Sequence, residues 1–201
     1  RLMNAFGDHA THSILSAVPE ALGARAAIDP AIAVDFPEAV ALHGKPGPIR
    51  YRRLARFMRQ YDLVLTYNWG SMDAVMAHRL AATFGTMPPL IHHEDGFNAD
   101  ESERLDRKRN MFRRLALPTA AALVVPSRRL EALARRHWGA RLPVRRIANG
   151  IMLTRYDVAN PADRHLLGEA DAGDVIVGTI AGLRAVKNLP GIGPLAIALL
   201  H

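Results

Sequence analysis

Ala-Ala-Leu-Val-Val-Pro-Ser, at residues 121–127, is the stretch that decides the fold of this chain. Its apolar run predicts a buried strand that Pro126 brings to an end. Ser127 follows at the position of a helix N-cap, because its side-chain oxygen can accept a hydrogen bond from a free N–H of the first helical turn. The following residues, 128–138, predict that helix. A strand followed directly by a capped helix is typical of an α/β protein.

Two further segments follow in a fixed order. Arg-Arg-Ile-Ala-Asn-Gly-Ile, at 145–151, predicts a short strand ending in Asn149 and Gly150, a pair that tolerates positive φ and turns the chain sharply. Val-Gly-Thr-Ile-Ala-Gly-Leu-Arg-Ala-Val-Lys-Asn, at 177–188, predicts a strand, a glycine-bearing loop and a basic residue near a helix start. That layout suits an anion, because a helix N-terminus offers free N–H groups and a favourable dipole.

Strands and helices alternate along the rest of the chain. Apolar runs predict strands at 12–18, 62–67, 90–93, 122–125 and 145–148, with a weaker one at 32–36. Amphipathic or charged segments predict helices at 1–7, 49–60, 71–84, 101–117 and 128–138, the third of them capped by Ser71. Strands that alternate with helices of this length predict βαβ units and one mainly parallel sheet.

The three segments, in this order, resemble the middle of a GT-B glycosyltransferase of the GT4 type (glycosyl transferases group 1), and the resemblance runs from about Asp62 to Asn188. It implies a Rossmann-like domain on the acceptor side, followed by the start of a second such domain on the donor side. We therefore expect an acceptor-side domain at 1–157, a polar linker at 158–173 and the beginning of a donor-binding domain at 174–201.

Both ends of the chain look incomplete against that pattern. The first strand and glycine turn of a Rossmann-like domain are expected before the helix at 1–7, and the second domain shows one clear strand. Our hypothesis is a fragment, a truncation or a chain with missing segments. A measured mass well above the 22.0 kDa of these residues would support missing segments, and a matching mass would leave a truncation. We expect these residues alone to be inactive while the parent protein is active.

The composition excludes several classes of protein. The chain has 201 residues, 49% of them apolar, enough for one sizeable core and part of another. It has no Cys, which excludes disulfides, cysteine zinc sites and thiol chemistry and fits a cytoplasmic location. No stretch approaches the roughly twenty consecutive apolar residues of a membrane-spanning helix, and the N-terminus shows no signal-peptide core.

The positive charge is concentrated in one part of the chain. The formal net charge is +7, and residues 101–160 hold fourteen Arg or Lys against five Asp or Glu. Such a basic region favours phosphates, in nucleic acid, anionic lipid headgroups or nucleotide substrates. The sequence has no recognised nucleic-acid motif, no Walker A sequence and no Gly-x-Gly-x-x-Gly after a strand. We therefore expect no nucleic-acid partner.

His-His-Glu-Asp-Gly-Phe, at 92–97, is the densest polar cluster and directly follows a predicted strand. Ligands of open α/β sheets bind at the carboxyl ends of strands. In the resemblance, Asp95 occupies the place of the histidine that faces the transferred sugar, with His93 and Glu94 sharing that catalytic role. The alternatives are a turn of solvated polar residues and a metal site, which the opposite orientation of adjacent strand side chains disfavours.

The resemblance assigns the donor diphosphate to the glycine-bearing loop. Lys187 matches the family's lysine, Arg184 stands in for the family's arginine two residues after its usual place, and Gly182 occupies that place. A guanidinium and an ammonium would neutralise a diphosphate leaving group. Asn149 and Gly150 would lie where the two domains meet. A solvated loop and a plain strand-ending turn are the alternative interpretations.

The acceptor side is expected at a second strand end. Asn68 and Trp69 follow the strand at 62–67, and with Gly96 they would line the cleft, with Trp69 stacking on a sugar face or serving as a buried aromatic. The helix at 104–114 mixes cations with apolar side chains. It can lie on an anionic membrane surface or form an ordinary solvated helix.

The resemblance thus implies a retaining, nucleotide-diphosphate-sugar-dependent glycosyltransferase of the hexosyltransferase type, as in polysaccharide biosynthesis. The acceptor would be a glycan, a lipid-linked sugar or a small molecule, with no metal and no other cofactor required. The expected location is the cytoplasm, with peripheral contact at the inner face of the membrane. The alternative is a non-catalytic nucleotide- or nucleic-acid-binding α/β module. The sequence fixes no oligomeric state.

Overall fold

The computed structural model describes residues 2–18, 20, 22–37, 40–42, 44–96, 106–139 and 141–150. The chain divides into two compact units, the first comprising 1–96 and 106–148 and the second 97–105 and 149–201. Nearly all of the second unit lies outside the described residues. The predicted linker and donor-binding domain, including the strand and loop at 177–188, fall there and stay predictions.

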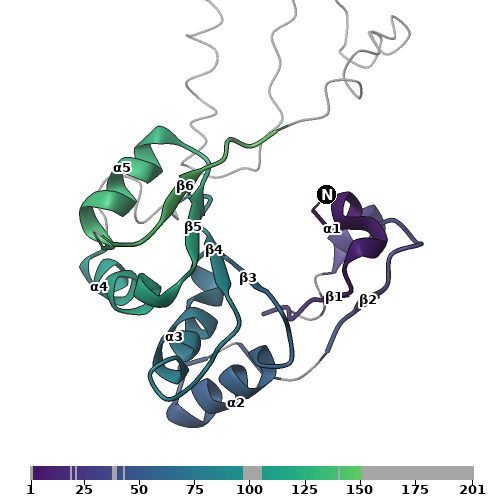
Figure 1. The fold of residues 1–201 in the computed structure, drawn as a ribbon, viewed down its shortest axis with the longest axis horizontal. Helices are drawn as coiled ribbons and strands as arrows, with labels where there is room; N and C mark the ends of the chain where they lie inside the picture. Colours follow the sequence, from purple (N-terminus) through teal and green to yellow (C-terminus); the bar gives the residue numbers. More distant parts are fainter. Residues whose placement is uncertain are drawn as a thin grey trace, which may run out of the picture. The chain divides into compact units, whose positions relative to one another are not determined.

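A parallel four-stranded sheet forms the centre of the first unit (Figure 1). Its strands lie in sequence order, and each pairs in parallel with the next. They are β3 (Val64–Tyr67), β4 (Leu90–His93), β5 (Ala122–Val125) and β6 (Val144–Arg146). The strands expected at 62–67, 90–93, 122–125 and 145–148 are therefore confirmed, within a residue or two at their ends. The Rossmann-like α/β class is confirmed with them.

Each crossover between neighbouring strands carries a helix. These are α3 (Met72–Ala81), α4 (Arg107–Ala116) and α5 (Arg128–His137), and α2 (Pro48–Met58) precedes β3 and packs on α3. Parallel crossovers are right-handed, so a sheet whose strands follow one another in order places its crossover helices on one face. Figure 1 shows α3, α4 and α5 along the same side of the sheet.

The alternation of burial along the strands shows which face carries the core. Buried positions recur at every second residue: Leu90 and His92 in β4, Leu123 and Val125 in β5. The residues between them are only half-buried, because successive side chains of a strand point to opposite faces. The core therefore lies between the sheet and its helices.

The N-terminal residues form a small substructure. It contains α1 (Leu2–Phe6), short 3-10 turns at Gly7–His9 and Gly23–Ala27, and a two-stranded parallel sheet of β1 (His12–Ser13) and β2 (Val34–Asp35). The helix expected at 1–7 and the weaker strand at 32–36 are thus present. The strand expected at 12–18 is shorter, and it belongs to this separate sheet rather than to the four-stranded one.

Of the two serine N-caps expected from the sequence, one is present and the other is not. Ser127 caps α5, its Oγ accepting a hydrogen bond from the Leu130 N–H at 3.2 Å, as predicted. Ser71 does not cap α3, because its hydroxyl donates instead to the carbonyls of Tyr67 and Asn68. Neither Asn149 nor Gly150 has positive φ, so the tolerance of positive φ that this pair offers is not used here.

Candidate functional site at the carboxyl edge of the sheet

The carboxyl ends of β3 and β4 bring together polar residues that are far apart in the sequence. The ladder continues past the strands, since the Asn68 N–H donates to the carbonyl of His93 at 2.7 Å. Tyr67, Asn68 and Asp95 are exposed there and His93 is half-buried. This is the edge at which open α/β sheets bind ligands, so the structure joins the predicted catalytic segment to part of the predicted acceptor segment.

Asn68 links the two strand ends through its side chain. Its Oδ1 accepts a hydrogen bond from the Asp95 N–H at 2.8 Å, and its Nδ2 lies 3.5 Å from Asp95 Oδ2. Its backbone has φ 57° and ψ −175°. That conformation is rare for residues other than glycine, and no sequence signal at Asn68 had indicated it.

His93 and Tyr67 form a stacked pair beside Asp95. Their ring centroids are 4.7 Å apart with an interplanar angle of 25°. Burial and the neighbouring His92 lower the pKa of His93 from 6.5, and Asp95 opposes that change. Burial, and then Asp95, raise the pKa of Tyr67 from 10.0. At neutral pH the edge therefore presents an uncharged imidazole and an uncharged phenol.

Glu94 lies on the other side of the strand, in the core. It is 1% exposed, and its Oε2 accepts a hydrogen bond from Arg113 Nε at 3.0 Å. Buried His92 places its Nε2 3.9 Å from the same oxygen and its Nδ1 2.9 Å from Thr66 Oγ1. Glu94 thus departs from the expectation that it faces a sugar. The period of two along a strand puts it on the face of His92, opposite His93.

Sequence reasoning missed Arg113 as part of this cluster. It is 1% exposed although it belongs to the most basic stretch of the chain. A signal was available in the sequence: apolar Ala116 and Leu117 follow Arg113 three and four residues later, a spacing that predicts all three on one face of a helix.

Trp69 is half-buried and its ring is already in contact with protein groups. The guanidinium carbons of Arg109 and Arg113 lie 5.4 and 5.1 Å from its ring centroid. Phe112 meets it edge-on, with the centroids 5.8 Å apart. Cation–π and edge contacts of this kind hold the indole against α4, so the structure favours the buried-aromatic interpretation over sugar stacking.

The remaining predicted site residues are placed as follows. Gly96 is exposed at the end of the β4 segment. Asn149 and Gly150 are exposed and belong to the second unit. Gly182, Arg184 and Lys187 lie outside the described residues. In the ranges that are described, no three His, Asp or Glu side chains come together as a metal site.

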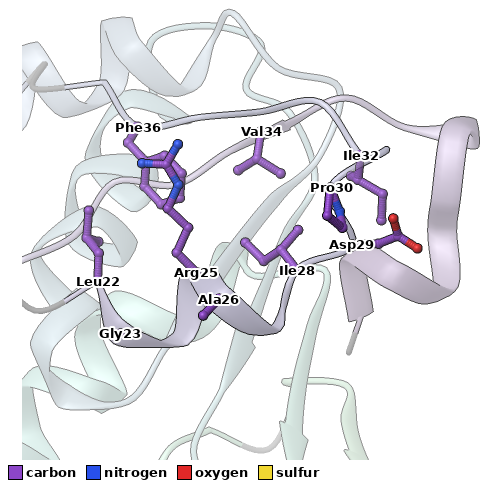
Figure 2. A pocket seen from close by; sticks show the side chains of 10 residues that line it. All are labelled: Leu22, Gly23, Arg25, Ala26, Ile28, Asp29, Pro30, Ile32, Val34 and Phe36. Atoms are coloured by element: carbon purple, nitrogen blue, oxygen red, sulfur yellow. The ribbon is translucent and has the colours of Figure 1, made fainter.

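A pocket of about 580 Å³ lies within residues 22–36 (Figure 2). Its lining is mostly apolar, from Leu22, Ile28, Pro30, Ile32, Val34 and Phe36 among others. Arg25 stands 4.9 Å over the ring of Phe36, and Asp29 is the acidic residue of the lining. The pocket lacks the converging titratable groups of the sheet edge, so it is the weaker candidate for a catalytic site.

The parallel sheet, its single-sided crossovers and the polar carboxyl edge define a Rossmann-like domain of the kind that binds substrates at strand ends. The family model described as Glycosyltransferase Family 4 matches residues 8–155, well over half of the chain. The chain therefore belongs to that family and carries a GT4-type glycosyltransferase domain of the GT-B class. No curated protein matches it. Among the described residues, no helix is both long and apolar enough to cross a membrane.

Proposed function

We propose that this protein is a retaining glycosyltransferase that moves a hexose from a nucleotide-diphosphate sugar to a hydroxyl acceptor. The family match supports glycosyl transfer in general. The observation that carries the finer proposal is the geometry of Asp95: an exposed carboxylate at the end of β4, bonded through its backbone N–H to Asn68 and next to the His93–Tyr67 stack.

The proposed roles follow from charge. In glycosyl transfer the bond from the sugar's anomeric carbon to the diphosphate breaks, a bond to the acceptor oxygen forms, and the acceptor's proton passes to the departing diphosphate. Positive charge develops on the sugar in the transition state. The carboxylate of Asp95 stabilises that charge or binds sugar hydroxyls. His93 contributes an uncharged imidazole, which accepts a hydrogen bond from a hydroxyl. A charged imidazolium would instead attract the diphosphate. Glu94 acts from the core, by holding the end of β4 through Arg113.

The donor side of the proposal rests on residues of the second unit. Lys187 and Arg184, after Gly182, would hold the diphosphate, with Asn149 and Gly150 near the junction of the domains. No metal or other cofactor is invoked, since two cations beside a helix N-terminus can neutralise the leaving group.

A thermal-shift panel of UDP-, GDP- and ADP-sugars with the intact protein tests the donor class. One nucleotide sugar should raise the melting temperature, and Lys187→Ala should weaken its binding by about 2–3 kcal/mol, the scale of one charge-assisted contact. Arg129→Ala, on exposed α5, is a matched control for loss of a surface cation. Unchanged affinity in Lys187→Ala would refute the diphosphate assignment.

An assay of transfer and donor hydrolysis with radiolabelled UDP- and GDP-sugars tests the expectation that these 201 residues alone bind nucleotide sugars weakly and transfer nothing measurable, while the parent protein is active. Catalysis in the proposed fold needs two domains to close over the donor and exclude water. Robust turnover by the 201 residues would place the whole site around His93 and Asp95.

We further propose that the protein is cytoplasmic, that it contacts the membrane peripherally and that its acceptor is a glycan or a lipid-linked sugar. The outer face of α4 supports it: Met111 and Leu115 are each 56% exposed, and Arg107, Lys108 and Arg114 are exposed beside them. Apolar and basic groups on one helix face suit an anionic lipid surface. Co-sedimentation with phosphatidylglycerol vesicles should fall in Met111→Ser/Leu115→Ser and be unchanged in Ile49→Ser, an exposed apolar residue on α2.

A further inference from the structure

Asn68 has an unusual backbone at the edge of the candidate site. Among the residues that the structure describes, it is the one non-glycine with positive φ, at 57° with ψ −175°. Glycine would adopt this conformation without strain, whereas a side chain there is unfavourable. Glycine at position 68 would relieve this backbone strain. The presence of asparagine instead indicates that its side chain contributes something that glycine lacks.

The contacts of Asn68 show what that contribution is. Its Oδ1 accepts from the Asp95 N–H at 2.8 Å, and its Nδ2 lies 3.5 Å from Asp95 Oδ2. Its own N–H donates to the His93 carbonyl, and its carbonyl accepts from the Ser71 N–H at 3.2 Å. The backbone is thereby fixed on both sides, and the side-chain amide is directed at Asp95, beyond the last paired residue of β4.

We propose that Asn68 is a positioning residue that fixes the backbone and carboxylate of Asp95 at the open edge of the sheet, rather than an acceptor-binding residue. The inference rests on the proposed function, since it gives Asn68 its role through Asp95. We call the two contacts from the Asn68 side-chain amide to Asp95 the clamp. Without the clamp, Asp95 would be an exposed residue after β4 whose N–H has no partner in the ladder.

The Asn68→Gly variant separates this role from a purely structural one. It removes the side chain and also relieves the backbone strain, so the melting temperature should be unchanged or higher. Turnover should nevertheless fall by about 10- to 100-fold in kcat, the scale of a misplaced reacting group, with little change in the donor KM. Asn68→Asp keeps an oxygen acceptor for the Asp95 N–H and should keep that amide bonded.

Two substrate-free NMR readouts complete the test. Hydrogen exchange at the Asp95 amide should be faster in Asn68→Gly than in the wild type and remain slow in Asn68→Asp. The pKa of His93, which Asp95 raises, should fall in Asn68→Gly toward its value in Asp95→Asn. The double variant Asn68→Gly/Asp95→Asn should show no further fall.

The outcomes distinguish the inference from the proposed function. Unchanged amide exchange and an unchanged His93 pKa in Asn68→Gly would overturn the positioning role. Faster exchange with full turnover of UDP-, GDP- or ADP-sugars would also overturn it, provided that Asp95→Asn is inactive. If Asp95→Asn is itself fully active, the proposed function of Asp95 fails, while the exchange data still report whether the clamp exists.

Discussion

The ion pair between Glu94 and Arg113 is almost fully enclosed, since each residue is 1% exposed. Removing one member of a buried pair leaves the other without compensation. Glu94→Gln and Arg113→Met should therefore each lower the free energy of unfolding by about 3–5 kcal/mol. The double variant should cost less than the sum of the two, because it leaves no unpaired charge.

Urea denaturation of the four proteins measures these differences, with the m-value as a check that unfolding stays two-state. Strict additivity would contradict the account of Glu94 as a core residue coupled to Arg113. Glu131→Gln is a useful control, because Glu131 is half-buried and pairs with two exposed arginines, Arg135 and Arg146, so the change should alter stability by less than about 1 kcal/mol.

His93 gives the fold a defined pH dependence. Its pKa in the folded protein lies below the unfolded value of 6.5, chiefly through burial. Between those two values the unfolded chain binds more protons, so stability rises with pH, and below the folded pKa the loss is complete. His93→Asn should flatten the dependence of the melting temperature in that window. An unchanged slope would mean that another group produces it.

The residue scale is where sequence reasoning was least complete. The composition of the sequence located the polar residues at 92–95, but it did not show that they lie in two different environments. His92 and Glu94 are buried in the core, whereas His93 and Asp95 lie at the edge of the sheet. The period of two along a strand was sufficient to separate Glu94 from His93. The positive φ of Asn68 was not predictable, because it depends on bonds to His93 and Asp95, which are distant in the sequence.

The caps of the helices provide a test at the scale of the element. Ser127→Ala should destabilise the protein by about 1 kcal/mol, because the Leu130 N–H loses its partner at the start of α5. Ser127→Asp should retain the cap, and its negative charge should interact favourably with the dipole at the helix N-terminus. Thermal or urea unfolding measures both changes. Equal stability of wild type and Ser127→Ala would mean that water replaces the hydroxyl at no cost.

Strands and helices were predicted well where their signal is local. The apolar runs that became β3, β4 and β5 are short, bounded by turn residues and separated by helical segments, so pattern alone located them. The strand at 12–18 was extended too far and assigned to the wrong sheet, because pairing is a tertiary property that hydrophobicity does not specify. Ser71 shows the same limit, since its hydroxyl had two competing carbonyl acceptors.

At the scale of the whole molecule, the described domain supplies one edge of a site. The order β3-β4-β5-β6 aligns the carboxyl ends of the strands, and this alignment brings Asn68 beside Asp95. The family match covers residues 8–155 and therefore this whole edge. The donor-binding residues proposed at 182–187 lie beyond both the match and the described residues, so the complete reaction must be tested on the intact protein.

The most direct measurement is transfer and hydrolysis of radiolabelled UDP-, GDP- and ADP-sugars by the intact protein and its Asp95→Asn variant. The account predicts measurable turnover of one donor class and a loss of at least about 100-fold in kcat in Asp95→Asn, since an oriented charge facing the transition state is removed while the fold is kept. Glu131→Gln should retain full activity. Wild-type turnover that persists unchanged in Asp95→Asn would contradict the assignment of the reaction to this edge of the sheet.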